Sequence, residues 1–377
     1  MSRTNYDVVM IGAGIVGAAC ADELARRGLR VAVVDREMVG GGATAAGMGH
    51  IVVMDDSEAQ FALTRYSQRL WQALRPELPD DVEYEQCGTI WVAADEEEMV
   101  EVRRKHEYYG GRGVPTQVLD ARELKAIEPN LRDGMAGGLL VPEDVALYPP
   151  CAARFLIERA QKHGAEVRLG ASVAKIGRGE VLLSDGASTG GRIIVNAAGA
   201  WATALTPEVE IKKRKGHLVI TDRYRGFLRH QLVELGYLKS AHSTTSDSVA
   251  FNVQPRRTGQ ILIGSSRQYG AEHKEVDQEI LRRMLLRAQE YMPGLSSMSA
   301  VRTWTGFRAA TPDKLPLIGP WPGDESLFLA TGHEGLGITT SIGTAKLLAD
   351  QITGSNPEIP IEPYLPVRAS KECAHAD

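Results

Sequence analysis

Residues 6–35 read YDVVMIGAGIVGAACADELARRGLRVAVVD. The apolar, β-rich run at 6–11 is typical of a strand buried on both faces of a parallel sheet. The helical stretch 15–27 is followed by Gly28, and glycine commonly ends helices. Residues 29–35 have the pattern of a second strand. The segment therefore predicts a strand–turn–helix–strand unit of an α/β protein.

A glycine pattern lies between the first strand and the helix. Gly12, Gly14 and Gly17 form G-x-G-x-x-G, which permits a tight turn and lets a pyrophosphate approach the helix N-terminus. Asp35 closes the second strand, where a carboxylate can bind the hydroxyls of an adenosine ribose. This order of strand, glycine turn, helix, second strand and acidic residue predicts a Rossmann-like dinucleotide site. Asp35 argues against a ribose 2′-phosphate, but it does not choose between NAD and FAD.

Two further stretches are rich in glycine. Residues 40–50 read GGGATAAGMGH, and no Asp, Glu, Lys or Arg occurs between Val39 and Met54. A surface linker would more often carry charge, so we expect this backbone to press against a flat ligand. Residues 332–337 read GHEGLG and are expected to open the last helix, whose N–H groups and positive dipole end can face an anion.

Length and composition exclude several classes of protein. The 377 residues suggest roughly two to three domains. The balance of 43 basic and 48 acidic residues gives a net charge of −5, which excludes a global attraction to nucleic acid or anionic membranes. No apolar run reaches the ~18 residues of a membrane span. The run at 8–21 could suggest a secretory signal, but its glycines and the charged stretch after it favour a folded unit.

The cysteines show no pattern that would hold a metal or a disulfide framework. Cys20, Cys87, Cys151 and Cys373 are far apart and form no C-x-x-C pair. We therefore expect no metal site and a reducing cytoplasm.

Separated blocks of the chain resemble the D-amino acid oxidase-like family of FAD-dependent amine oxidoreductases. They are the glycine fingerprint, residues 43–49, residues 195–201 (VNAAGAW), and the C-terminal pair 304–319 and 331–340. The resemblance implies a Rossmann-like FAD-binding domain and a strand-rich α+β substrate domain. The expected FAD-binding domain comprises 1–85, 146–210 and 305–377, and the expected substrate domain comprises 86–145 and 211–304.

Within this family, the chain resembles the β subunits of D-hydroxyproline dehydrogenase, opine oxidase and hydrogen cyanide synthase complexes. The resemblance rests on AGMGH at 46–50, MDDS at 54–57, FALT at 61–64 and GHEGLGI at 332–338. It implies a hetero-oligomer with partner subunits that carry iron–sulfur clusters or a second flavin, with FMN at a subunit interface.

The resemblance also implies which residues hold FAD. Asp35 and Arg36 would contact the adenosine side, the loop 43–44 the pyrophosphate, and residues 48–50 the flavin ring. Val173 would contact the adenine through its backbone, and the alternative is a residue that only packs in the core. The full expected set is Gly12, Gly14, Ile15, Val16, Gly17, Asp35, Arg36, Ala43, Thr44, Met48, Gly49, His50, Val173, Gly199, Trp201, Gly332, His333, Gly335, Leu336, Gly337, Ile338 and Thr339.

Arg308 is the first candidate for binding the substrate. It lies in WTGFRAATPD, residues 304–313, where glycine-oxidase-like members place the arginine that binds the substrate carboxylate. A guanidinium suits this task because it binds a carboxylate with two parallel hydrogen bonds. The alternative is a structural salt bridge. Met48 and Asn252 are the other expected substrate contacts.

Two histidines lie nearest the expected flavin. His50 and His333 could each hydrogen-bond the ring or tune the protonation of the amine near neutral pH. A packing role is equally open for both. We take His50 with Arg308 as the catalytic candidates, while hydride transfer from a neutral amine needs no general base.

Departures from the relatives affect the expected chemistry. Gly306 occupies the place of the cysteine that links FAD covalently in the sarcosine oxidase type, so we expect noncovalent FAD. Leu262 replaces that type's oxygen-activating lysine, which favours a dehydrogenase, although glycine oxidase also lacks this lysine. Asn252 lies near the place of a substrate-contacting tyrosine in glycine oxidase, so we expect a substrate other than glycine.

The resulting expectation is oxidation of the Cα–N bond of a D-amino acid or secondary amino acid to an imine. The first candidate substrate is cis-4-hydroxy-D-proline, with electrons passing to a partner subunit. Alternatives are a stand-alone glycine or D-amino acid oxidase that uses oxygen, an opine dehydrogenase subunit, and a cyanide-forming glycine dehydrogenase subunit. A non-enzymatic alternative is a flavin-binding structural subunit.

Overall fold

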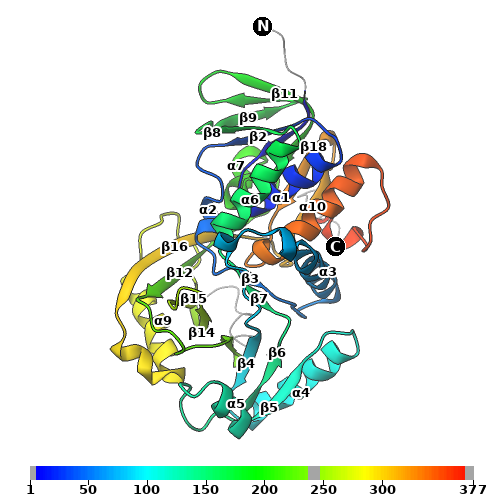
Figure 1. Ribbon diagram of the computed structural model, residues 1–377. Coiled ribbons are helices and arrows are strands. Elements are labelled where there is room, and N and C mark those ends of the chain that lie inside the picture. The colour runs from blue at the N-terminus through cyan, green and yellow to red at the C-terminus, as the bar shows by residue number, and fades with distance from the viewer. Residues whose placement is uncertain (1–5, 237–246, 370–377) are drawn as a thin grey trace, which may run out of the picture. The chain divides into compact units, whose positions relative to one another are not determined.

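The computed structural model describes residues 6–236 and 247–369, which divide into two compact units (Figure 1). The first unit contains residues 6–82, 148–213 and 307–369. The second contains residues 83–147, 214–236 and 247–306. Each unit is built on a sheet, which confirms the mixed α/β fold class. Cys373 lies outside the described residues.

The sheet of the first unit has the order β17-β18-β11-β1-β2-β8, with β10 and β9 attached to β11. Parallel pairing joins β1 to both β2 and β11. Val8, Val9 and Met10 in β1 are fully buried, which confirms the strand predicted to be covered on both faces. The strands are β1 (Tyr6–Ile11), β2 (Val31–Asp35), β3 (His50–Ile51), β8 (Glu166–Leu169), β9 (Val173–Gly177), β10 (Glu180–Leu183), β11 (Ser188–Asn196), β17 (Leu317–Trp321) and β18 (Asp324–Thr331).

Helix α1 lies at the centre of the helical layer in this unit. It packs against both α6 and α10, and its buried alanines allow this close approach (Figure 1). The helix begins at Ile15 and ends at Arg26, close to the predicted bounds. The helices are α1 (Ile15–Arg26), α2 (Gly42–Ala45), α3 (Glu58–Leu74), α6 (Pro149–Lys162), α7 (Ala202–Leu205) and α10 (Gly337–Thr353).

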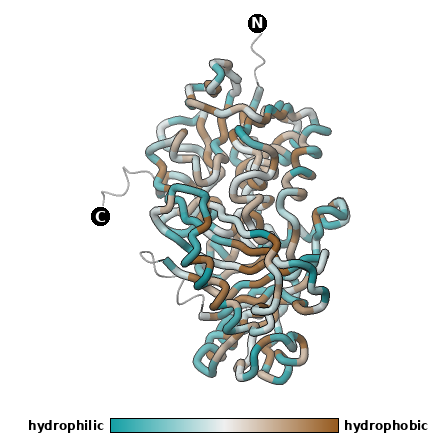
Figure 2. Tube along the Cα trace, turned by 90° about the vertical axis from the view of Figure 1, so that its left-hand side faces the viewer, coloured by the Kyte–Doolittle hydropathy of each residue, from teal (hydrophilic) through white to brown (hydrophobic). Residues whose placement is uncertain are grey.

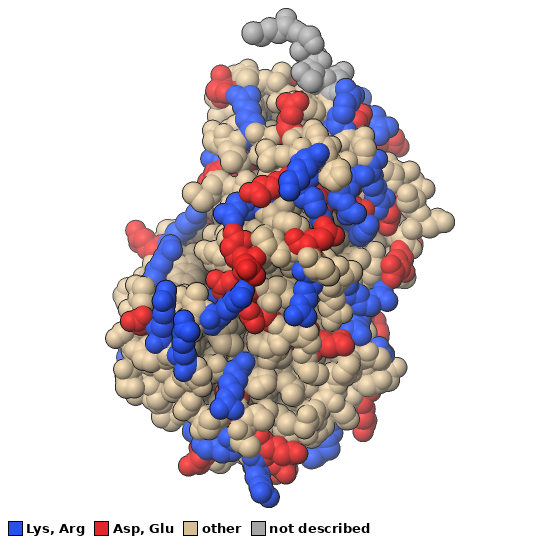
Figure 3. Space-filling view, in the orientation of Figure 1, with Lys and Arg blue, Asp and Glu red and all other residues tan. Residues whose placement is uncertain are grey.

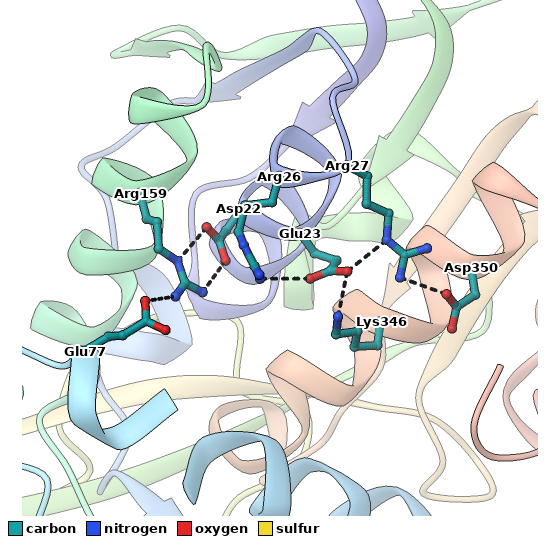
Figure 4. Close-up of polar contacts among 8 residues, drawn as sticks. All are labelled: Asp22, Glu23, Arg26, Arg27, Glu77, Arg159, Lys346 and Asp350. Atoms are coloured by element: carbon teal, nitrogen blue, oxygen red, sulfur yellow. Dashed lines mark hydrogen bonds and ion pairs between the residues drawn. The ribbon is translucent and has the colours of Figure 1, made fainter. Parts of the chain in front are cut away.

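Two buried acids of α1 connect it to its neighbours through ion pairs (Figure 4). Asp22 accepts two hydrogen bonds from the guanidinium of Arg159 in α6, at 2.8 and 2.6 Å. Glu23 accepts hydrogen bonds from Arg27 at 2.8 Å and from Lys346 in α10 at 2.9 Å. Asp22 is 3% exposed and Glu23 is 6% exposed. The pairs therefore compensate buried charge while they fix three helices against one another.

The sheet of the second unit has the order β16-β12-β15-β14-β13-β4-β6-β5. One face carries a hydrophobic core with α9, in which Phe251 stacks on Tyr291 with 4.4 Å between ring centroids. The elements are β4 (Thr89–Ala93), α4 (Glu96–Gly110), β5 (Gln117–Asp120), α5 (Ala121–Ile127), β6 (Gly137–Val141), β7 (Val145–Ala146), β12 (Lys212–Thr221), β13 (Gln231–Glu234), β14 (Ser248–Pro255), β15 (Ile261–Arg267), α9 (Gln278–Tyr291) and β16 (Ala300–Ala310).

Hydropathy and charge follow the fold. In Figure 2 brown, hydrophobic stretches run along interior segments, while teal, hydrophilic stretches lie on many loops. Acidic and basic side chains are interspersed on the face shown in Figure 3, as expected for a chain of near-balanced charge. Among the described residues, no helix combines the length and apolar character needed to cross a membrane.

Candidate active site

The glycines between β1 and α1 are required by close backbone packing. Gly12 has φ +111°, and a Cβ placed on it would lie 2.6 Å from the carbonyl oxygen of Ala197. A Cβ on Gly17 would lie 2.0 Å from the carbonyl oxygen of Gly12. Gly14 is the N-cap of α1, so the helix begins with its backbone N–H groups beside this turn. The turn therefore has the geometry that suits a bound pyrophosphate.

Thr44 and Asp35 fix the two sides of this turn. The backbone N–H of Ile15 donates to Thr44 Oγ1 at 2.9 Å. Asp35 Oδ2 accepts from the N–H of Ala13 at 2.6 Å, and its Oδ1 accepts from the N–H of Glu37 at 2.8 Å. Each carboxylate oxygen can accept more than one hydrogen bond. Asp35 therefore keeps acceptor capacity for ribose hydroxyls while it holds the turn.

Arg36 and Trp201 form a pair that was expected only as two separate contacts. The Arg36 guanidinium lies 4.4 Å from the centroid of the Trp201 ring, a cation–π distance. Trp201 packs edge-on against Phe307, and a Cβ on Gly42 would lie 3.7 Å from its ring. Nearby in sequence, Gly199 has φ +55°. These contacts bring the end of β2, the start of α2 and the 195–201 stretch to one place.

Two roles of Val173 remain compatible with the structure, a backbone contact with adenine and a place in the core. It is the first residue of β9, half-buried, and packs against the core formed by residues of β1, β2 and β11. Its side chain therefore has a core role, and a backbone contact with adenine remains a prediction.

The loop that contains Met48 and Gly49 packs against the beginning of α10. A Cβ on Gly47 would lie 2.7 Å from Ile338 Cδ1. Thr339 Oγ1 donates to the carbonyl oxygen of His50 at 2.9 Å. Met48 is buried and Ala43 is exposed. The loop is therefore held against a helix end by both packing and a hydrogen bond.

The turn before α10 brings Arg308 to the same region. The N–H of Glu334 donates to the carbonyl oxygen of Ala309 at 2.8 Å. A Cβ on Gly335 would lie 3.7 Å from Arg308 Nε, and one on Gly337 would lie 3.7 Å from Val16 Cγ2. The three glycine-rich stretches and the half-buried Arg308 thus converge within the first unit.

The last helix begins later than the glycine block suggested. Gly332 has φ +79° and Glu334 has φ +51°, and both values are incompatible with a right-handed helix. Residues 332–336 therefore form a turn, Leu336 is the N-cap, and α10 begins at Gly337. The N–H groups at the helix start come from Gly337, Ile338 and Thr339 rather than from the whole block.

His333 has a hydrogen-bond partner within the first unit. Its Nε2 lies 2.9 Å from Thr344 Oγ1, and the residue is 7% exposed. Burial lowers the pKa of His333 to about 3. The ring is therefore neutral at neutral pH, and its role beside the flavin remains a prediction. His50 is half-buried in β3, and its proposed catalytic role remains a prediction.

Asn252 lies in β14 of the second unit. It is half-buried, and among the described residues its Oδ1 has no hydrogen-bond partner. Its neighbours across the sheet are Val233 and Gly264. Its contact with the substrate stays a prediction based on the family resemblance.

Comparison with known proteins decides the family. The DAO family of FAD dependent oxidoreductases matches residues 7–351. The chain belongs to this family. The hydrogen cyanide synthase subunit HcnC of Pseudomonas aeruginosa is 30% identical, over 99% of this chain and 98% of the relative. This chain is therefore an FAD-dependent amino acid oxidase or dehydrogenase acting on a carbon–nitrogen bond.

Solved structures agree with this assignment. Glycine oxidase from Geobacillus kaustophilus superposes with a TM-score of 0.86 at 27% identity, covering 96% of this chain and 98% of that one. L-proline dehydrogenase from P. horikoshii superposes with a TM-score of 0.85 at 26% identity, covering 97% of both chains. These neighbours confirm the fold class expected from the sequence.

The residues of the first unit fit FAD. The turn at 12–17 has room only for glycine at its tightest points, and the Asp35 carboxylate lies at its edge. The exposed Arg36 is held on an indole, and α10 begins beside Val16. Together they offer a pyrophosphate cradle, a ribose acceptor and a helix N-terminus in one unit.

Proposed function

We propose that this chain oxidises the Cα–N bond of a D-amino acid or secondary amino acid to an imine, with cis-4-hydroxy-D-proline as the first candidate. The observation that carries the proposal is the place of Arg308 beside Gly335, at the turn that precedes α10. A substrate carboxylate bound there would lie at the region where the glycine-rich stretches converge. In this proposal the first unit is the FAD-binding domain and the second is the substrate domain.

FAD, when bound, supplies the acceptor for the hydride that leaves Cα. Arg308 binds the carboxylate through its two parallel N–H groups and thereby orients Cα. Met48, in the same unit, contacts the remainder of the substrate, and His50 lies beside the reacting amine. The buried, neutral His333 holds the α10 turn through Thr344. Hydride transfer starts from a neutral amine, so the ammonium form of the substrate must lose its proton before the hydride leaves. This requirement favours turnover at higher pH.

We further propose that electrons pass to partner subunits with iron–sulfur clusters or a second flavin, and that FMN lies at an interface. The similarity to a hydrogen cyanide synthase subunit supports an assembly of several chains. The similarity to glycine oxidase favours a second candidate, a stand-alone oxidase that passes electrons to oxygen. We also propose that the protein works in a reducing cytoplasm.

An anaerobic titration tests the reaction. The purified FAD-loaded protein is mixed with D-proline, cis-4-hydroxy-D-proline, sarcosine, glycine and an opine, and the flavin absorbance is followed. We expect at least one of these amines to bleach the flavin. The proposal fails if none of them does so while dithionite bleaches it fully.

A further inference from the structure

The second unit contains a hollow of about 230 Å³. Two segments line it: the loop 222–230, which joins β12 to β13, and the turn 256–260 between the antiparallel neighbours β14 and β15 (Figure 1). At about 30 Å³ per water, this volume corresponds to roughly eight waters. The hollow therefore has room for a small organic molecule and is too small for a nucleotide.

Hydrogen bonds fix the two segments to each other. The N–H of Tyr224 donates to the carbonyl oxygen of Gly259 at 2.7 Å. Within the turn, the N–H of Arg256 donates to the carbonyl oxygen of Gln260 at 2.9 Å. Gly259 has φ +90°, and a Cβ placed on it would lie 2.5 Å from Arg225 Cγ. The glycine thus leaves the space that the Arg225 side chain occupies against the turn.

Part of the lining is apolar. Leu228 is 6% exposed and Ile261 is 1% exposed, and both belong to the hydrophobic core of this unit. Tyr224 packs against the same core, and Pro255 lines the hollow beside it. The apolar body of a ligand can therefore bury its surface there.

The rest of the lining is basic. Arg225, Arg256 and Arg257 contribute to it, and none of the described residues that line the hollow is acidic. Arg256 Nη2 lies 2.7 Å from Glu83 Oε2, and Arg257 Nε lies 3.4 Å from Glu85 Oε1. These two glutamates balance two of the three positive charges. The net charge of the lining therefore comes from Arg225.

Arg225 is placed to meet an anion. Its side chain is exposed, and within residues 6–236 and 247–369 its guanidinium has no hydrogen-bond or ion-pair partner. A guanidinium binds the oxygens of a carboxylate or a phosphate with parallel N–H groups. A concave, partly apolar lining screens such an attraction less than open water does.

We propose that this hollow binds a small anion with an apolar body, whose carboxylate or phosphate group meets Arg225. The charged group accounts for the unpartnered guanidinium, and the apolar body accounts for the surface offered by Leu228, Pro255 and Ile261. The site lies wholly within the second unit and uses none of the residues proposed for the oxidation.

The test titrates the FAD-loaded full chain with 4-fluorobenzoate and with 4-fluorophenyl phosphate, and follows binding by fluorine NMR. Uncharged 4-fluorobenzamide and inorganic phosphate are the comparison ligands. Arg225→Gln removes the charge. Arg223→Gln is the matched control, because Arg223 is an exposed arginine of the same loop that does not line the hollow. Arg308→Lys identifies any binding that belongs to the proposed substrate site.

We expect at least one fluorinated anion to bind, and the tighter of the two identifies the charged group. Arg225→Gln should raise its Kd by about tenfold or more, since charge-assisted hydrogen bonds are lost. Arg223→Gln and Arg308→Lys should leave that Kd within about threefold of wild type, because exposed charges outside the site contribute little. Higher salt should weaken the binding. The unfolding midpoint of Arg225→Gln should equal that of wild type, because an exposed side chain without partners is replaced.

Three results would each overturn the inference. The first is that neither fluorinated anion binds. The second is that Arg225→Gln binds both as tightly as the Arg223→Gln control does. The third is that 4-fluorobenzamide or inorganic phosphate binds as tightly as the fluorinated anions, which would leave the charge or the apolar body without a role. None of these measurements needs turnover, so their failure is distinguishable from failure of the proposed function.

Discussion

Arg308 is the residue on which substrate orientation depends in the proposed mechanism. Arg308→Lys keeps a positive charge but loses the planar fork that binds a carboxylate with two hydrogen bonds. We expect kcat/KM for an amino acid substrate to fall by about two orders of magnitude, since charge-assisted bidentate contacts are strong. Steady-state assays with a dye acceptor measure this.

The matched control is Arg302→Lys, because Arg302 is an exposed arginine in the same strand, β16. It should leave kcat/KM within about twofold of wild type. An Arg308→Lys protein with full FAD and unchanged kcat/KM would show that the carboxylate binds elsewhere.

His333 makes the stability of the fold depend on pH. Burial lowers its pKa to about 3 from the usual histidine value of 6.5, so the folded state disfavours the protonated ring. Between these two pKa values the unfolded chain binds the proton and the folded protein does not. Stability is therefore lost as the pH falls below about 6.5, with a slope of up to about 1.4 kcal/mol per pH unit from this group.

His333→Gln removes the titrating ring and keeps a polar group opposite Thr344. Urea unfolding at pH 7 and at pH 5 should show a smaller decrease in the free energy of unfolding for the variant than for the wild-type protein. Equal decreases in the two proteins would show that His333 is not held neutral by burial.

At the scale of elements, the ion pairs of α1 are expected to stabilise its packing against α6. Arg159→Met leaves the Asp22 carboxylate buried without its charged partner, and such losses typically cost about 3–5 kcal/mol. Chemical denaturation should therefore show a marked decrease in the free energy of unfolding. Arg159→Met combined with Asp22→Leu should recover much of the loss, because no buried charge then remains.

Arg154→Met is the control, since Arg154 pairs with Asp81 on the exposed side of the same helix. Exposed pairs contribute about 0–1 kcal/mol. If the single Arg159 variant were no less stable than this control, the buried pairs would not hold the helices together.

The elements that the sequence predicted well are those whose signals are local. The bounds of β1 and α1 follow from an apolar run and from glycines whose neighbours leave no space for a Cβ. The start of α10 was predicted too early. A glycine-rich stretch is typical both of a turn before a helix and of the helix start itself, so it does not tell the two apart. Positive φ values at Gly332 and Glu334 decide the matter.

Contacts between distant segments had no such signal. The Arg36–Trp201 stack joins residues far apart in the chain, and the pairing of His333 with Thr344 depends on a turn that propensity does not specify.

At the scale of the whole molecule, the first unit is assembled from three separate stretches of the chain, and the residues expected to hold FAD come from all of them. The relatives include both oxidases and dehydrogenases, so the electron acceptor is the property that separates them. We expect the isolated chain to reduce an artificial dye in the presence of substrate while it consumes oxygen at least about tenfold more slowly. Paired dye-reduction and peroxide assays measure this.

Peroxide formation at the rate of dye reduction would contradict a dedicated partner subunit and would favour the stand-alone oxidase. Copurification of the chain from its native source provides the control, because an assembly with further flavin or iron–sulfur subunits should reduce the dye faster than the isolated chain.

In the proposed reaction this protein oxidises the Cα–N bond of an amino acid to an imine while its own flavin is reduced. A single-turnover experiment without oxygen tests it most directly. The FAD-loaded protein is mixed with excess cis-4-hydroxy-D-proline or D-proline, and flavin reduction and imine product are measured in the same sample. We expect one imine for each flavin reduced. Flavin that stays oxidised with every amino acid tested, or flavin reduction without imine, would contradict it.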